Sequence, residues 1–236
     1  MKINTTILII IFTTFAFLLK AEALYDGNYG ITENTNNKKN IYITVDLCPS
    51  HHLDYSEELF QSFIDISKSR NQAIPVAISI SGHWLLKHQE ALEEIKTIEK
   101  NGYIKITWVN HSYAHYDNPS LDNSHNFMIH DISNASNDID KNRDLMIKNN
   151  LTPSNFFRFP GLISNNYLNN LVENKGYKIL GASAWLNKTN GKFKGGDIIL
   201  IHGNKNEERG VKLFIDNFTT GKFNNYNFGS LEDFNE

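Results

Sequence analysis

The stretch IKITWVNHSYAH, residues 104–115, joins a strand-like run to two histidines four positions apart. Residues 104–109 carry the apolar and β-branched side chains that are typical of a buried strand. In a helical turn, side chains at i and i+4 lie on one face, so such a turn would bring His111 and His115 together. Two neutral imidazoles held in this way can share one divalent cation. The stretch therefore predicts a metal-binding loop after a strand, although a histidine pair on a polar loop is by itself more often a surface feature.

Short β-rich runs alternate with helical stretches on both sides of this segment. We expect strands at residues 41–45, 75–80, 104–109, 156–159, 178–180 and 198–201, and helices at residues 56–69, 84–100, 129–148, 167–174 and 207–217. This alternation is typical of parallel strands joined by right-handed helical crossovers, in an open doubly wound sheet or in a closed barrel. In both architectures the active site lies beyond the carboxyl ends of the strands.

Several of the expected strands end in a side chain that can bind metal or transfer a proton. These side chains are Asp46, His111, His115, Arg158 and His202. Each of them alone fits a structural or solvated role. Together, at one rim of a sheet, they provide the ligands, the base, the group that orients the base and the acid that a metal-assisted hydrolase needs.

The composition indicates one globular domain. The chain has 236 residues, of which 40% are hydrophobic, enough for a sizeable core. Residues 24–40 are rich in Gly, Asn, Thr and Lys and predict a loose arm, and residues 41–236 predict the folded domain. The formal net charge of −3, with scattered lysines, argues against a nucleic-acid partner. The single cysteine, Cys48, excludes an intramolecular disulfide.

The N-terminus has the features of a secretory signal peptide. Lys2 precedes an apolar run at residues 7–19, and Ala21 and Ala23 form a small-x-small cleavage box. The run is shorter than the roughly 20 apolar residues that cross a bilayer, which disfavours an uncleaved anchor. We therefore expect residues 1–23 to be removed and the protein to be exported, periplasmic or secreted, without an integral membrane segment.

From about residue 41 to residue 219 the chain resembles the polysaccharide deacetylases, the NodB-homology family of carbohydrate esterases. The family motifs Thr-Phe-Asp-Asp-Gly, His-[Ser/Thr]-x-x-x-His, Arg-x-Pro and Leu-x-His correspond to residues 44–48, 111–115, 158–160 and 200–202. The resemblance implies an α/β fold, a single-domain distorted (β/α) barrel. It also implies a divalent metal, with zinc expected, and hydrolysis of N-acetyl groups on a cell-wall or surface glycan.

The resemblance assigns a role to each matched side chain. His111 and His115 hold the metal, and Asp46 takes the proton of the attacking water. Arg158 orients Asp46 and keeps it ionised, and His202 protonates the departing sugar amine, because an amide nitrogen leaves poorly unless it is protonated.

The first motif departs from the family pattern, since Leu47 stands where the family has a second Asp, normally a metal ligand. Either Asp46 is the base and the metal has two imidazole ligands, or Asp46 binds the metal and the base is unfilled. Arg158 favours Asp46 as base, and on that basis Leu47→Asp is expected to strengthen metal binding. Cys48, His51 and His52 are near enough in sequence to supply a donor, but each is interpreted as a loop or packing residue.

A further motif of the family is only partly matched around Trp185, which either stacks on a sugar or fills the core. We see no acid near it in sequence that would pair with His202. Two functions therefore stay open, a metal-dependent deacetylase and a catalytically impaired NodB-like protein that binds glycan without turnover. Esterase action on O-acetyl groups would use the same machinery.

Overall fold

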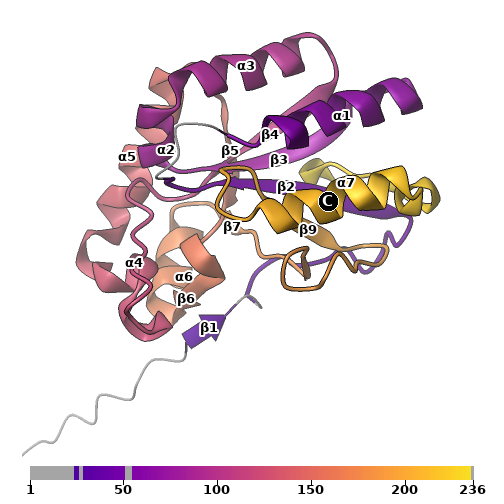
Figure 1. The fold of residues 1–236 in the computed structure, drawn as a ribbon. Coiled ribbons are helices and arrows are strands. Elements are labelled where there is room, and N and C mark those ends of the chain that lie inside the picture. The colour runs from indigo at the N-terminus through magenta and orange to yellow at the C-terminus, as the bar shows by residue number, and fades with distance from the viewer. Residues whose placement is uncertain (1–23, 27–28, 51–54, 235–236) are drawn as a thin grey trace, which may run out of the picture.

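A curled sheet of parallel strands forms the centre of the protein (Figure 1). The computed structural model describes residues 24–26, 29–50 and 55–234. In the order of their hydrogen bonding, the strands are β7 (Lys178–Ile179), β5 (Pro153–Phe157), β4 (Ile104–Asn110), β3 (Ile74–Ile80), β2 (Asn40–Leu47), β9 (Ile198–His202) and β8 (Ala184–Trp185), and β10 (Asn227–Phe228) pairs with the start of β2. This partly closed barrel confirms the predicted fold class.

Helices connect and cover these strands. They are α1 (Glu57–Arg70), α2 (Gly82–Lys87), α3 (Gln89–Lys100), α4 (Phe127–His130), α5 (Ala135–Lys148), α6 (Asn166–Asn174) and α7 (Glu208–Thr219). Helices α1 and α3 run along one side of the sheet, and α7 packs beside α1 and against β9 (Figure 1). The short strand β1 (Leu24–Asp26) pairs antiparallel with β6 (Ile163–Asn165).

Three predicted elements differ from the observed ones by more than one or two residues at an end. The helix expected at 84–100 is two helices, because the backbone of His88 leaves the helical region at φ −119° and ψ 51°, and Leu86 is turned outward and is 55% exposed. The helix expected at 129–148 is broken at Asp131, whose φ of −131° separates α4 from the turn before α5. The strand expected at 156–159 begins earlier, at Pro153, a position where a residue without an N–H is tolerated.

Alternation along β2 decides which side chains face the site. Ile41, Ile43, Val45 and Leu47 belong to the main core between the sheet and the helices. Asp46 projects from the opposite face and reaches Arg158. The Leu47 side chain is fully buried and lies against the backbone of Gly203, where an added Cβ would be 3.1 Å from Leu47 Cδ2. Leu47 therefore points away from the face that carries Asp46, and an aspartate at position 47 would enter the apolar core.

The arm expected to be loose runs, over residues 29–40, from the edge strand β7 to the segment that precedes β9, near the other end of the strand order. The N–H of Ile31 donates to the carbonyl of Ile179 at 2.8 Å, and the N–H of Asn34 donates to the carbonyl of Gly196 at 2.8 Å. A bridge also pairs Glu33 with Asp197. These contacts attach the arm to the folded domain.

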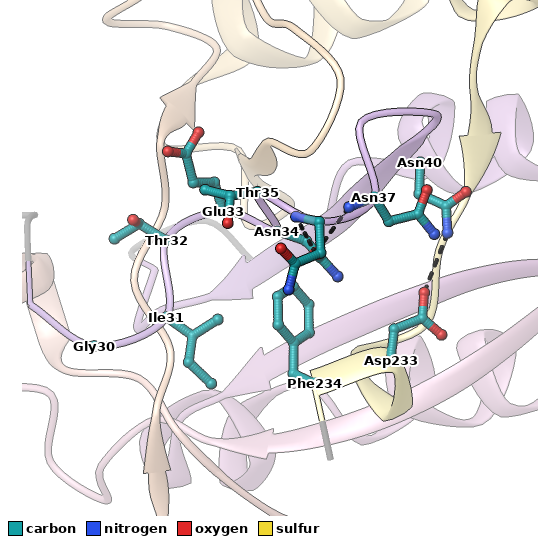
Figure 2. Close-up of a pocket in the computed structure, with 11 residues that line it drawn as sticks. Gly30, Ile31, Thr32, Glu33, Asn34, Thr35, Asn37, Asn40, Asp233 and Phe234 are labelled. Carbon is teal, nitrogen blue, oxygen red and sulfur yellow. Dashed lines mark hydrogen bonds between the residues drawn. The ribbon is translucent and has the colours of Figure 1, made fainter. Parts of the chain in front are cut away.

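The arm also lines a pocket, shown in Figure 2, near the start of β2. Asn34 Oδ1 accepts from the backbone N–H groups of Asn36 and Asn37, both at 3.1 Å, and Asn40 Nδ2 donates to Asp233 at 3.2 Å. Several of the amides therefore shape the arm itself. Since Asn40 begins β2 and the catalytic motif ends it, this pocket lies at the opposite end of the strand from the candidate site.

The predicted leader, residues 1–23, lies outside the described residues, as do His51 and His52. Within the described ranges, no helix combines the length and apolar character that crossing a membrane requires.

Candidate metal and catalytic site

The histidine pair lies in an irregular loop after β4. Ser112 and His115 have left-handed backbones, with φ of 70° and 43°, so the helical turn predicted for this loop is wrong. The two rings still meet, because the centroids of His111 and His115 are 4.7 Å apart with the planes at 68°. Left-handed backbone at residues other than glycine persists only where the surroundings hold it.

Helix α5 supplies one of the groups that hold this loop. The carboxylate of Asp138 accepts the backbone N–H groups of Tyr113 at 2.8 Å and Ala114 at 2.9 Å. Within the loop, the hydroxyl of Ser112 accepts the N–H of His115 at 3.1 Å. These bonds satisfy backbone donors that no regular element pairs, and they fix the direction of the second histidine.

A pair of buried asparagines holds the other end of the loop. Asn142 Nδ2 donates to Asn110 Oδ1 at 2.8 Å, and Asn110 Oδ1 also accepts the N–H of Ser112 at 3.1 Å. Sequence reasoning missed Asn110, Asn142 and Asp138 as site residues. The position of Asn110 between a strand and a histidine was a usable signal. Asp138 and Asn142 gave none, because they belong to α5, which lies far from the histidines in sequence.

Three buried side chains form a group that can hold a metal ion. Donor atoms of Cys48, His111 and His115 all lie within 4.8 Å of one another. Cys48 Sγ is 3.5 Å from His111 Nε2. Sequence reasoning interpreted Cys48 as a loop or packing residue, whereas the structure brings it to both predicted ligands.

The hydrogen bonds around the two histidine rings fit a bound cation. His111 Nδ1 lies 2.8 Å from the backbone carbonyl of Arg158, which can only accept, so Nδ1 carries the hydrogen and Nε2 presents its lone pair toward Cys48. His115 is only 8% exposed, and neither of its ring nitrogens has a hydrogen-bond partner among the described residues. A buried imidazole without a partner is costly, and a cation would satisfy it.

Electrostatics keep both imidazoles in the form that binds metal. Burial lowers the pKa of His111, and burial together with the neighbouring His111 lowers the pKa of His115 well below its ordinary value. Burial, followed by the charge of Asp46, raises the pKa of the Cys48 thiol well above its ordinary value. Without a cation, the site therefore contains two neutral imidazoles and a neutral thiol.

Arg158 holds Asp46 from inside the curled sheet. The guanidinium is fully buried, and its Nη1 donates to Asp46 Oδ1 and to Thr44 Oγ1, both at 2.8 Å. Nη2 donates to the carbonyl of Gly181 at 2.8 Å, and Nε donates to the carbonyl of Leu180 at 3.3 Å. A guanidinium with this many partners is a rigid positioning group.

The Asp46 carboxylate is left with one oxygen directed to the histidine side. Its Oδ2 is 3.8 Å from His111 Nε2. Burial opposes ionisation of Asp46, but the charge of Arg158, with smaller contributions from the nearby imidazoles, lowers the pKa of its carboxyl below the ordinary value. Asp46 is therefore an ionised carboxylate beside the candidate metal group, as a general base must be.

His202 ends β9, directly beside Asp46 in the register of the sheet. Its Nδ1 lies 3.0 Å from Glu207 Oε2, and Trp185 Nε1 donates to the same oxygen at 2.7 Å. The expectation that His202 lacks an acidic partner is therefore wrong. Glu207 lies five residues after His202, at the N-cap of α7, whereas the sequence-based expectation concerned only acids near Trp185.

Trp185 packs with His202 and Glu207 and is not among the residues of the main core. Its ring centroid is 5.2 Å from that of His202, and the ammonium of Lys188 lies 3.7 Å from the ring centroid. Burial opposes ionisation of Glu207, but the hydrogen bond and charge of His202 lower the pKa of the carboxyl below its ordinary value. The ionised carboxylate therefore lies within hydrogen-bond distance of His202 Nδ1.

Known proteins share this architecture. The sequence model of the family described as polysaccharide deacetylase matches residues 33–180. A family 4 carbohydrate esterase from Bacillus anthracis is similar with a TM-score of 0.59 and 18% identity, over 88% of this chain and 86% of that one. PdaA of Bacillus subtilis, also a family 4 carbohydrate esterase, is similar with a TM-score of 0.59 and 20% identity, over 86% of this chain and 82% of that one. A pseudoenzyme of that esterase family from Bacillus anthracis is similar with a TM-score of 0.58 and 14% identity, over 86% of this chain and 67% of that one. At these identities the structures establish a shared fold.

Proposed function

The chain belongs to the polysaccharide deacetylase family of hydrolases, and we propose that it is an exported, metal-dependent enzyme that removes N-acetyl groups from a cell-wall or surface glycan. The observation that carries this proposal is a buried group of potential metal ligands, including His111 and His115, beside the ionised Asp46. Ligands, base and acid at one rim are the parts that hydrolysis of an amide requires.

Metal binding and water activation belong to the histidine side of the site. A divalent cation, zinc in this proposal, would be held by His111 and His115 and would act as a Lewis acid that polarises the acetamide carbonyl and acidifies a water molecule. Asp46 accepts the proton of the attacking water. Arg158 keeps that carboxylate ionised and fixes its direction through the 2.8 Å bond to Oδ1.

Protonation of the leaving group belongs to the other side. His202 in its imidazolium form donates a proton to the sugar nitrogen as the carbon–nitrogen bond breaks. Glu207 contacts Nδ1 of His202, so the Nε2–H of the same ring is the proton available to substrate. Trp185 lies next to His202, where an aromatic face can contact the sugar that carries the acetamide.

A binding-only protein is the second candidate function. Leu47 in place of the family's aspartate favours it, because Leu47 offers no donor atom and points into the core. The fold is also compatible with loss of turnover, since a pseudoenzyme is among the similar structures. Such a protein would bind glycan oligomers without releasing acetate.

Metal analysis and acetate release separate the two functions. Protein purified without chelator should contain close to one equivalent of zinc or a similar cation, and it should release acetate from N-acetylglucosamine oligomers. A chelator should abolish the release, and added zinc should restore it. His111→Ala should behave as the chelated protein does, whereas His125→Ala, at a side chain that is 73% exposed, should match wild type. Oligomer binding without acetate, with or without zinc, would support the binding-only function instead.

A further inference from the structure

We propose that the thiolate of Cys48 is the third protein ligand of the metal, in place of the carboxylate that the family has at the position of Leu47. The inference rests on the proposed function, because it concerns the same metal. It makes the site a two-histidine, one-cysteine centre, in which Asp46 stays free to act as the base.

The alternation of β2 explains why residue 48, and not residue 47, takes this role. Asp46 and residues two positions away from it share one face, and Leu47 lies on the other face, within the apolar core. Just beyond the end of the strand, Cys48 lies on the Asp46 side and is only 5% exposed. Its backbone carbonyl accepts Asn204 Nδ2 at 3.0 Å, which anchors the turn that presents the thiol.

The distance between the donor atoms fits a shared ion. A tetrahedral zinc with a Zn–S distance of about 2.3 Å and a Zn–N distance of about 2.0–2.1 Å holds sulfur and nitrogen about 3.6 Å apart. Cys48 Sγ and His111 Nε2 are 3.5 Å apart. The pair therefore has the spacing of two ligands of one zinc ion without any rearrangement.

Both imidazoles are prepared for the same ion. The carbonyl of Arg158 takes the Nδ1 hydrogen of His111, which leaves the Nε2 lone pair for the metal. His115 is buried, has both ring nitrogens unpartnered among the described residues, and lies with Cys48 and His111 in one group of donor atoms. An ion in that group would satisfy the buried imidazole.

Asp46 is a weaker candidate for the third ligand. One of its oxygens is committed to Arg158 at 2.8 Å, and the group of donor atoms within 4.8 Å of one another, searched over the described residues, holds Cys48 and both histidines but not Asp46. A thiolate carries the same single negative charge as the carboxylate that it replaces. The charge of the loaded site is thus conserved, while the softer sulfur favours zinc over magnesium, calcium or manganese.

Cobalt substitution of the full mature chain tests this ligand directly. Cys48 is the only cysteine of the chain, so a thiolate-to-cobalt charge-transfer band can come from no other residue. Wild type loaded with Co²⁺ should show this near-ultraviolet band. Cys48→Ser should lose the band and bind zinc about tenfold or more weakly. Cys48→Asp should restore most of the affinity without the band.

A thiol titration gives a second readout that does not depend on a variant folding. With an excess of thiol reagent, the single cysteine of wild type should react faster in the zinc-free protein than in the zinc-loaded protein, because coordination blocks the thiolate. Circular dichroism of Cys48→Ser and Cys48→Ala shows whether each variant keeps its fold.

The outcomes separate this inference from the proposed function. If Co²⁺ binds through His111 and His115 but no sulfur band forms, and zinc leaves the thiol reactivity unchanged, then Cys48 only donates a hydrogen bond and the inference is overturned. The metal-dependent function survives that result. If wild type binds neither cobalt nor zinc, both proposals fail together, and the binding-only function replaces them.

Discussion

The two sides of the site differ in how they are enclosed. On the metal side, His111, His115 and Cys48 are all below 9% exposed and rest on buried backbone and amide contacts. On the leaving-group side, the side chains of His202 and Glu207 are 13% and 22% exposed and contact each other across a short loop. Under the proposed function, the metal side holds its donor atoms in place, and the leaving-group side has the solvent access that proton exchange with substrate requires.

The difference shows how one rim can support two kinds of chemistry. Burial keeps the imidazoles of the metal side neutral, which suits ligands. On the other side, the Glu207 carboxylate contacts Nδ1 of His202 at 3.0 Å, so the opposite ring nitrogen, Nε2, points away from the carboxylate. Asp46 lies between the two sides, and its negative charge is paired with the guanidinium of Arg158. Substitutions on the two sides should accordingly have separable effects.

The largest effect is expected from removing a metal-side imidazole. His115→Leu should abolish zinc binding and acetate release while leaving the metal-free protein at least as stable as wild type, because the ring has no hydrogen-bond partner among the described residues. Zinc at about 100 times its dissociation constant should stabilise wild type by about 2.7 kcal/mol and the variant not at all. Thermal unfolding with and without zinc measures both. Zinc-dependent stabilisation that persists in His115→Leu would remove this histidine from the metal site.

On the leaving-group side the metal should stay and turnover should fall. His202→Ala should bind zinc with wild-type stoichiometry and lose about 10²–10⁴-fold in kcat, the usual contribution of a general acid. Metal analysis and acetate release on the same preparation check both halves of this statement. A variant that lost zinc as well would show that the two sides are one unit, and unchanged turnover would exclude His202 as the acid.

Leu47 sharpens the comparison between neighbouring positions on β2. Leu47→Asp should lower the free energy of unfolding by about 3 kcal/mol or more, because it places a carboxylate without a partner in the apolar core. Leu47→Met, which conserves volume, should cost less than about 1.5 kcal/mol. Urea unfolding measures both variants. Zinc titration should show no increase in zinc affinity for Leu47→Asp. A stable variant that bound zinc more tightly than wild type would instead support a site with two imidazole ligands that lacks the family's carboxylate.

The course of β2 also explains what sequence could and could not predict. Strand ends, helices and the five motif residues follow from hydrophobic periodicity and spacing, and the resemblance to a family supplied their roles. From the sequence alone, Leu47 could only be aligned with the second aspartate of the family motif. In the structure Leu47 packs in the apolar core, and the donor atom of Cys48 lies within 4.8 Å of those of His111 and His115.

Contacts that join distant segments were the part that sequence could not supply. Asp138 and Asn142 reach the histidine loop from α5, and no periodicity marks them as site residues. The left-handed backbone at His115 replaced the expected helical turn, because these side chains offer the loop other hydrogen-bond partners. Glu207 was missed for a simpler reason, since its nearness to His202 depends on how the loop before α7 folds back.

The smallest effect in this series is expected from Glu207→Gln. The amide keeps an oxygen for Trp185 Nε1 but loses the charge that the carboxylate presents to Nδ1 of His202. Acetate release should therefore fall by about tenfold or less, with little change in zinc content.

Stability provides an independent check with a definite sign. In the folded protein burial opposes ionisation of Glu207, but His202 lowers the pKa of the carboxyl overall. The carboxylate therefore contributes stability above the unfolded-state pKa of about 4.3, and this contribution is lost as pH falls through the lower folded-state pKa. Wild type should exceed Glu207→Gln in stability near neutral pH, and the two should converge on acidification below about pH 4. A stability difference that stays constant across that range, together with unchanged acetate release, would show that Glu207 only holds Trp185 in place.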